Sequence, residues 1–326
     1  MLLAPIISVF ITLNFGITSG DCYSLPCTNN RPIIGILSQE ISDYMNSQYP
    51  RNYSSYIVAS YVKFIEGAGG RVVPIWIGKN NSYYEDILGK INGVLWPGGA
   101  AYFDTNNGYA DAGYKIYNIA KNMNRNGDYF PILGICLGFE LLTYIEAKRV
   151  EHRINCSSEN QPLPLEFTPD YRNSRMFNNI SLAIINILKN ENVTINNHHW
   201  CVTKKGLKKV NVYNNFNILS FNHDWNGIKF ISSLEHVMLP FYGIQFHPEK
   251  NLYEWVDGRN ISHTENAIRV TRYFADFFLR EARKNGHRFP TTDEEAKKLI
   301  YNYPVTYTAL KSAYLQCYMF RERDTV

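Results

Sequence analysis

Short apolar runs that alternate with helical patterns between residues 32 and 135 constrain the fold of this chain more than any other feature. Strands are expected at 32–37, 72–77, 93–96 and 131–135, and helices at 53–67, 83–91 and 109–126. The runs show no alternation of apolar and polar residues, which is typical of a parallel sheet covered by helices on both faces. We therefore predict a doubly wound α/β fold with a mostly parallel sheet. Its ligands should bind beyond the carboxyl ends of the strands, in the loops after Leu37, Trp96 and Ile135.

The second half of the chain is less regular. Residues 150–226 are polar and rich in Asn, with an antiparallel strand pattern at 193–202. Further strands are expected at 230–234 and 242–245, and an amphipathic helix at about 264–284. At 326 residues, the chain fits one large domain, which we place at 31–326 with a C-terminal extension from about residue 285.

Composition excludes several classes of protein. An apolar share of 45% and a charged share of 19% are ordinary for a globular chain, so neither a disordered nor a fibrous protein is indicated. The net charge is only +4, and no block of Lys and Arg would follow a phosphate backbone. We expect no nucleic acid partner.

Residues 1–20 carry no charge and contain an apolar run that is too short for a good membrane span. Small residues at 18–20 favour cleavage, so we interpret 1–20 as a signal peptide and 21–30 as an N-terminal segment. An uncleaved anchor is the alternative, although we expect no stable membrane insertion. Sequons begin at Asn52, Asn80, Asn155, Asn179, Asn192 and Asn260. Leader and sequons together predict a glycoprotein that is secreted or resides in a lysosomal or vacuolar lumen.

Cys136 lies between two glycines, in Gly134-Ile-Cys-Leu-Gly138, where an expected buried strand meets a helix. This arrangement is the cysteine form of a nucleophile elbow, because the glycines permit a tight turn that lifts the side chain above the sheet. The helix N-terminus is expected to stabilise the thiolate, and the amide of Leu137 to donate to an oxyanion. The alternative is a buried structural cysteine with incidental glycines.

Pro97-Gly98-Gly99 ends an earlier strand of the same expected sheet. Paired glycines let backbone amides approach a substrate carbonyl closely, so Gly99 is the second candidate oxyanion donor and Gly98 a candidate substrate contact. The same tripeptide also occurs in ordinary turns.

His247 and Glu249 follow the strand expected at 242–245. A cysteine nucleophile needs a base, and the base needs a group that orients it, so we assign these roles to His247 and Glu249. A surface loop with a chance His and Glu is the alternative.

Besides Cys136, the chain has five cysteines, so at least one of them stays unpaired. No spacing of Cys or His indicates a metal site. We expect neither a metal nor a cofactor.

The order of Pro-Gly-Gly at 97–99, Gly-x-Cys-Leu-Gly at 134–138 and His-Pro-Glu at 247–249 resembles class I glutamine amidotransferase-like domains, which have a flavodoxin-like fold. Segments that are similar, more narrowly, to folate γ-glutamyl hydrolases are 31–37, 59–63, 68–74, 136–140, 247–250 and 316–318. The resemblance covers nearly the whole chain. It implies a cysteine hydrolase that cleaves γ-glutamyl amide bonds of folate polyglutamates through a thioester on Cys136.

The resemblance also implies substrate contacts. Glu140 stands where glutaminase domains usually have Gln, and can meet an α-amino group. His198 is similar to a further active-site histidine of the hydrolases, although the adjacent His199 leaves the alignment open by one residue. Tyr56 is similar to a substrate-contacting tyrosine, with ordinary packing as the alternative. Lys250 offers a charge to a polyanionic tail.

Three other functions share these motifs. A glutaminase subunit would need a synthase to consume its ammonia, and no such domain is present in this chain. A non-catalytic binding module of the same fold would predict a damaged elbow or a missing base, and both are intact. A peptidase that uses the same elbow is the third alternative. We expect a small-molecule partner, a folyl or antifolate polyglutamate, and leave a homodimer open.

Overall fold

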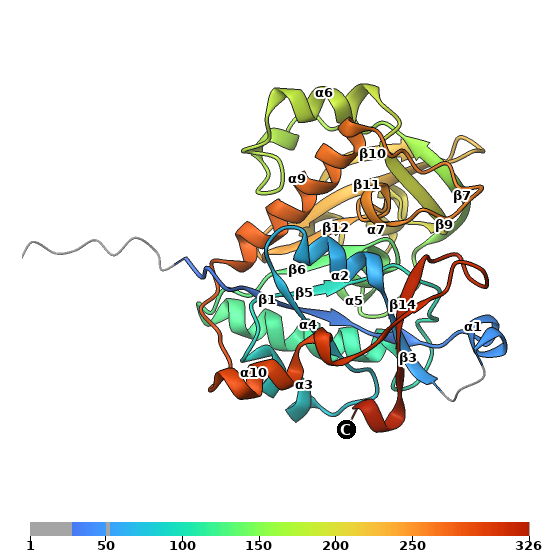
Figure 1. Ribbon diagram of the computed structural model, residues 1–326. Coiled ribbons are helices and arrows are strands. Elements are labelled where there is room, and N and C mark those ends of the chain that lie inside the picture. The colour runs from blue at the N-terminus through green and yellow to red at the C-terminus, as the bar shows by residue number, and fades with distance from the viewer. Residues whose placement is uncertain (1–27, 50–52, 326) are drawn as a thin grey trace, which may run out of the picture.

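The computed structural model describes residues 28–49 and 53–325 (Figure 1). Its central sheet has eight strands in the order β4-β1-β5-β6-β12-β11-β10-β8. Their bounds are β4 Arg71–Ile75, β1 Ile33–Leu37, β5 Val94–Trp96, β6 Ile132–Ile135, β12 Phe241–Ile244, β11 Lys229–His236, β10 Phe216–His223 and β8 Glu166–Phe167. The five strands from β4 to β12 are parallel, and the last three pair antiparallel.

Helices cover both faces of this sheet (Figure 1). In β1, Ile34 and Ile36 join one buried cluster, with side chains of α2 (Ala59–Glu66) and α9 (Glu265–Ala282). Ile33 and Leu37 join the other, with α3 (Asn81–Leu88), α4 (Tyr109–Arg125) and α5 (Leu137–Glu146). Both sides of the strand are therefore buried, which explains the missing apolar–polar alternation. The predicted doubly wound α/β fold is confirmed.

Residues 53–67 depart from the prediction of a single helix. The structure has strand β3 (Tyr53–Val58) followed directly by α2. β3 pairs antiparallel with β14 (Gln316–Arg321), in a second sheet ordered β13-β14-β3-β2, with β2 at Gln39–Glu40 and β13 at Val305–Tyr307. A pairing partner more than 250 residues away decides the strand, so the local pattern could not reveal it.

The C-terminal extension is therefore part of a sheet. It contains α10 (Thr292–Lys298), the short helix η3 (Ile300–Asn302), the two strands β13 and β14, and η4 (Glu322–Thr325). Cys317, Met319 and Phe320 of β14 are buried in the cluster that also holds α2 and α9. The end of the chain thus packs beside elements from its beginning.

The polar middle of the chain forms a two-stranded antiparallel sheet of β7 (Ile154–Leu163) and β9 (Thr194–Cys201). A disulfide joins Cys156 of β7 to Cys201 of β9. Cys317 is buried and unpaired, in agreement with the prediction that at least one of the five cysteines besides Cys136 forms no disulfide. The remaining elements are α1 (Asp43–Gln48), η1 (Tyr171–Asn173), α6 (Leu182–Asn190), α7 (Lys204–Lys209), η2 (Tyr213–Asn215) and α8 (Lys250–Tyr253).

Some predictions concern residues that the structure does not describe. The signal peptide at 1–20, nearly all of the segment at 21–30, Cys22, Cys27 and Asn52 fall there. Within 28–49 and 53–325, no helix has both the length and the apolar character needed to cross a membrane.

Candidate active site

The chain turns sharply where β6 meets α5, and Cys136 is the residue at this turn. Its backbone has φ 52° and ψ −106°, a conformation that non-glycine residues rarely adopt. A Cβ atom on Gly134 would lie 2.4 Å from the Gly138 carbonyl oxygen, and one on Gly138 would lie 2.1 Å from the Trp96 oxygen, so the turn requires both glycines. The Cys136 amide donates to the Ile244 carbonyl at 2.8 Å, which ties the turn to β12.

Burial sets the protonation state of the Cys136 thiol. Loss of solvent raises its pKa well above the ordinary value, and the negative charge of Glu140 raises it further. The charge of Lys250 and the amide of Leu137 act in the opposite direction but are weaker than burial. The Leu137 amide at the start of α5 thus acts in the expected direction, but burial outweighs it. The thiol keeps its proton at neutral pH until a base removes it.

His247 is placed to be that base. Its Nδ1 lies 2.8 Å from Glu249 Oε1, and both side chains are buried. With the Nδ1 proton donated to this carboxylate, Nε2 is left with a free lone pair. Burial lowers the pKa of His247, and the charge of Lys250 lowers it further, while Glu249 raises it. The imidazole is therefore neutral at neutral pH and able to accept a proton.

Gly98 lies between the cysteine and the histidine. A Cβ atom there would be 2.7 Å from His247 Cε1 and 3.1 Å from Cys136 Cβ, so any larger residue would force these side chains apart. The Gly98 amide donates to the hydroxyl oxygen of Tyr61 at 2.8 Å, and this hydroxyl lies 3.2 Å from His247 Nδ1. The role of Gly98 in this structure is thus to let the two reactive groups approach each other.

Gly99 and Leu137, the two candidate oxyanion donors, line the same pocket as Cys136. Gln39 fixes the loop that carries Gly99, because its Nε2 donates to the carbonyls of Pro97 and Gly98 at 3.1 and 3.0 Å. A Cβ atom on Gly99 would lie 1.7 Å from Gln39 Oε1, so any other residue would displace the Gln39 amide from these two carbonyls. Gly99 and Leu137 thus line one cavity, although they follow two different strands of the sheet.

The pocket in front of Cys136 has a volume of about 480 Å³. Its walls come from the loop after β5, the start of α5, the segment before β7, and β9. The loops after Trp96 and Ile135 were predicted to border a ligand site, and both contribute lining residues. On the β9 side only His198, or the adjacent His199, was expected at the site, and the segment before β7 was not predicted to border it.

Glu140 lines this pocket, but its carboxylate is already paired. Oε2 lies 2.8 Å from Arg153 Nη1, and Oε1 accepts a hydrogen bond of 3.1 Å from Gln245 Nε2. Gln245 Nε2 is in turn 3.8 Å from the sulfur of Cys136. Burial raises the pKa of Glu140, and Arg153 opposes that rise.

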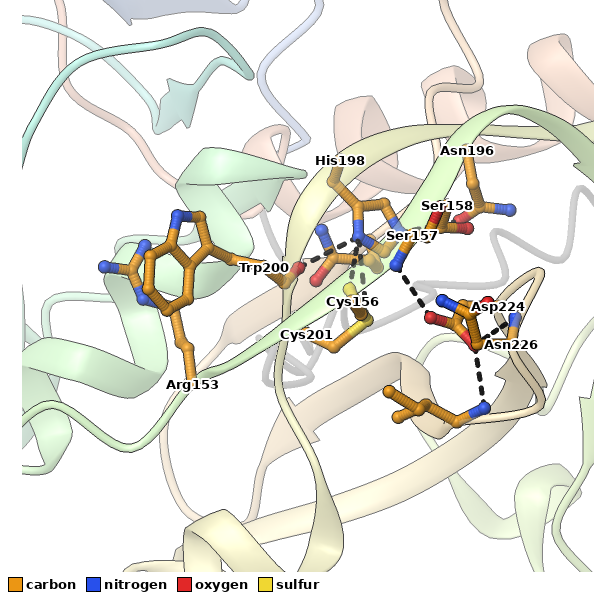
Figure 2. The surroundings of a disulfide bond; sticks show 12 residues. Arg153, Cys156, Ser157, Ser158, Asn196, His198, Trp200, Cys201, Asp224 and Asn226 are labelled. Carbon is orange, nitrogen blue, oxygen red and sulfur yellow. Dashed lines mark hydrogen bonds between the residues drawn. A yellow bond between two sulfur atoms is a disulfide. The ribbon is translucent and has the colours of Figure 1, made fainter.

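Both candidate histidines of β9 border the pocket, in different environments. His198 is buried, with Nδ1 2.9 Å from the Trp200 carbonyl oxygen and Nε2 3.3 Å from Asn196 Oδ1 (Figure 2). Burial lowers the pKa of His198 to about 3, so it remains neutral. His199 is mostly exposed and lies 3.0 Å from Glu159.

The Cys156–Cys201 disulfide lies directly beside His198 (Figure 2). The Nδ1 atom of His198 is 3.6 Å from the sulfur of Cys156 and 3.8 Å from that of Cys201. These three donor atoms lie close enough together to hold a metal ion. Since both sulfurs are bonded to each other, they offer no thiolate to a metal in this state.

Tyr56 and Lys250 lie outside the wall of the Cys136 pocket. The Tyr56 hydroxyl is buried 3.5 Å from Gln39 Oε1. The Lys250 side chain is also buried, with Nζ 6.0 Å from the ring centre of Tyr314, yet its charge reaches both Cys136 and His247. Tyr314 belongs to the C-terminal extension, so the end of the chain contributes to the surroundings of the site.

Several residues of the site were not anticipated from the sequence: Gln39, Tyr61, Arg153, Gln245 and Tyr314. Tyr61 lies in the similar segment 59–63 but no role was assigned to it, and the other four lie outside the motifs. Their polar atoms meet the motif residues only because the folded sheet brings separate segments together.

Comparison with known proteins agrees with this geometry. Residues 32–249 match the family described as peptidase C26. The γ-glutamyl hydrolase of Rattus norvegicus is 43% identical over 296 residues, which is 90% of either chain. γ-Glutamyl hydrolase B of Dictyostelium discoideum is 38% identical, over 90% of this chain and 84% of its own, and the Homo sapiens enzyme is 39% identical, over 90% and 91%. The chain belongs to the γ-glutamyl hydrolase family, peptidase C26.

Proposed function

We propose that this protein is a cysteine hydrolase that cleaves the γ-glutamyl amide bonds of folate polyglutamates through a thioester on Cys136. The observation that carries the proposal is that Cys136, which lines a pocket, and His247 both pack so closely around Gly98 that a Cβ atom there would lie 3.1 Å and 2.7 Å from them. Membership of a family of γ-glutamyl hydrolases supports the choice of bond. No cofactor is required.

Acylation follows from this arrangement. The sulfur of Cys136 attacks the γ-carbonyl carbon while His247 Nε2 takes the thiol proton, and the amides of Leu137 and Gly99 stabilise the oxyanion. His247 then gives this proton to the departing amine as the C–N bond breaks, which leaves a γ-glutamyl thioester. A neutral imidazole and a protonated thiol are the starting state for the first transfer, and the imidazolium that it forms is the donor for the second.

Deacylation reuses the same residues. Water takes the place of the departed amine, His247 removes one of its protons, and the resulting hydroxide adds to the thioester carbonyl. Collapse of this adduct releases the γ-carboxyl product, and the proton on His247 returns to the sulfur. Glu249 holds the imidazole in one tautomer through both halves of the reaction.

A panel of three substrates tests this proposal. Purified protein is given a pteroylpoly-γ-glutamate, L-glutamine and an α-linked glutamyl peptide, and kcat/KM is measured for each. We expect the γ-linked polyglutamate to be cleaved far faster than glutamine is deamidated, and the α-linked peptide to resist. Equal or better activity on glutamine would replace the hydrolase proposal with a glutaminase.

We also propose that the protein works outside the cytosol, in a secretory or lysosomal or vacuolar lumen. The Cys156–Cys201 disulfide supports this, because disulfides persist in oxidising compartments. The five sequon asparagines that the structure describes are all exposed, namely Asn80, Asn155, Asn179, Asn192 and Asn260.

A further inference from the structure

Arg153 is the one Arg or Lys among the described residues that line the Cys136 pocket. The other charged lining residues, Asp104, Glu140 and Glu151, are acidic. The side chain of Arg153 is only 9% exposed, so its charge lies within the cavity wall. A buried cation that faces a substrate pocket is a candidate for recognition of an anion.

The guanidinium of Arg153 is held rigidly. It lies 4.1 Å from the ring centre of Phe103 and 5.2 Å from that of Trp200. Nη1 donates to Glu140 at 2.8 Å, and Nε and Nη2 donate to the two carboxylate oxygens of Glu151 at 3.0 and 2.7 Å. A ligand would therefore meet a group whose orientation is already fixed, which reduces the entropy cost of binding.

Two donors of this guanidinium remain free for a ligand. Arginine carries five N–H groups, one on Nε and two on each terminal nitrogen. Bonds to described residues use the Nε donor, one donor on Nη1 and one on Nη2. One N–H on each terminal nitrogen is left, which is the number that a bidentate carboxylate takes.

The proposed substrate carries a matching anion. In a γ-linked polyglutamate, each glutamate is joined through its side-chain carboxyl, so its α-carboxylate is free and ionised while the α-nitrogen of an internal residue is an amide. Glu140 therefore finds no α-amino group to bind, and without a cation beside it would repel the α-carboxylate. Contacts run from the Cys136 sulfur through Gln245 and Glu140 to Arg153, so the cation stands beside the position of the acyl group.

We propose that Arg153 binds the α-carboxylate of the glutamyl residue whose γ-amide is cleaved, with Glu140 holding the guanidinium in position. This inference rests on the proposed function and names the group that the pocket recognises. Arg153 would make the enzyme select γ-linked glutamyl chains that keep their α-carboxylates.

The test uses a pair of pteroyl-γ-diglutamates whose acyl glutamate carries either an α-carboxylate or an α-carboxamide. The wild type should prefer the carboxylate roughly tenfold to a hundredfold in kcat/KM, the range expected for hydrogen bonds between charged groups. Arg153→Met should remove this preference by slowing only the carboxylate substrate, and Arg153→Lys should retain part of it. Equal losses on both substrates would overturn the inference and leave Arg153 a structural residue.

Two controls address damage to the fold. Arg149 is matched to Arg153, since it lies 4.2 Å from the Tyr114 ring centre and 2.9 Å from Asp111, but it does not line the Cys136 pocket, so Arg149→Met should keep the preference. Arg153→Met leaves Glu140 buried and unpaired. The preference for the carboxylate substrate is therefore also measured in Glu140→Gln and in the double variant Glu140→Gln/Arg153→Met. The inference requires a smaller preference in the double variant than in Glu140→Gln.

A readout without turnover separates this inference from the proposed function. L-Glutamate should protect Cys136 of the wild type from iodoacetamide better than its α-carboxamide does, and Arg153→Met should abolish the difference. If the wild type cleaves neither pteroyl substrate, the proposed function fails while this protection still decides the role of Arg153. Identical protection of the wild type by both compounds would overturn the inference that Arg153 binds the α-carboxylate.

Discussion

Cys136 depends on its neighbours for reactivity, because burial alone would keep it an inert thiol. The glycine at 98 allows His247 and Cys136 to pack closely together, and Glu249 holds Nδ1 of the imidazole. Tyr61 adds a hydroxyl that joins the His247 ring to the loop of Gly98. In the proposed mechanism, Cys136 is therefore activated at the moment of proton transfer, because its pKa is raised and not lowered.

Glu249→Gln should change the pH profile in a defined direction. Glu249 raises the pKa of His247, so removing its charge lowers that pKa further and moves the acidic limb of kcat/KM to lower pH. The plateau rate should fall about tenfold or more, because the amide stabilises the imidazolium less well. Glu166→Gln is the matched control, since Glu166 lies 2.7 Å from His223 at an exposed position. An acidic limb that moves upward would contradict this account.

The motif residues of the site could be predicted from the sequence, and their supporting residues could not. Cys136, Gly98 and Gly99 are recognisable because a sharp turn and close backbone approach demand specific residues within a few positions. Arg153 and Tyr61 act through partners that are distant in sequence, such as Glu140 and Gly98. No short window contains both members of such a pair, so only the folded chain reveals them.

The same distinction holds for helices and strands. α9 was predicted well because its apolar stripe and the Thr264 cap, which accepts from the Ala267 amide, are local features. β3 was missed because its partner is β14 at the other end of the chain. The sheet of β7 and β9 has weak patterning and a disulfide whose pairing the sequence did not indicate.

Phe320 tests whether the C-terminal extension is integral to the fold. It is fully buried in β14, with its ring centre 4.6 Å from that of Trp76 and 5.2 Å from that of Tyr303. Phe320→Ala should lower the free energy of unfolding by about 3–5 kcal/mol. Leu310→Ala in the same extension should change it little, because Leu310 is 86% exposed. A small effect of Phe320→Ala in urea denaturation would mean that the extension is dispensable.

The Cys156–Cys201 disulfide should stabilise the β7–β9 sheet, whose strand β9 lines the pocket. It closes a loop with a sequence separation of 45, so the Cys156→Ser/Cys201→Ser protein should lose about 2–4 kcal/mol in its free energy of unfolding. A reductant should destabilise the wild type to a similar degree and leave the double variant unchanged. Denaturation curves of the wild type that do not respond to the reductant would show that the bond contributes nothing.

At the scale of the whole molecule, the central sheet carries Cys136, and β9 with the segment before β7 forms another wall of its pocket. The C-terminal strand β14 pairs with β3. The helices and parallel strands were largely predictable because their patterns repeat along the chain. The arrangement of the polar middle was not, since long-range pairing determines it.

Targeting is also a property of the whole chain. The uncharged apolar leader and the exposed sequons predict that protein recovered from the medium or from vesicles begins near Asp21 and loses mass on treatment with an N-glycosidase. N-terminal sequencing and gel mobility measure both. A cytosolic, unglycosylated protein that retains Met1 would contradict the proposed location.

The most direct test of the central claim is to find the acyl group on the enzyme. Protein turning over a pteroylpoly-γ-glutamate is quenched in acid and digested, and the masses of its cysteine peptides are measured. The account predicts a substrate-derived γ-glutamyl adduct on the Cys136 peptide, none on the peptide with the free Cys317, and loss of both adduct and turnover in Cys136→Ala. An adduct on another residue, or undiminished turnover by Cys136→Ala, would contradict it.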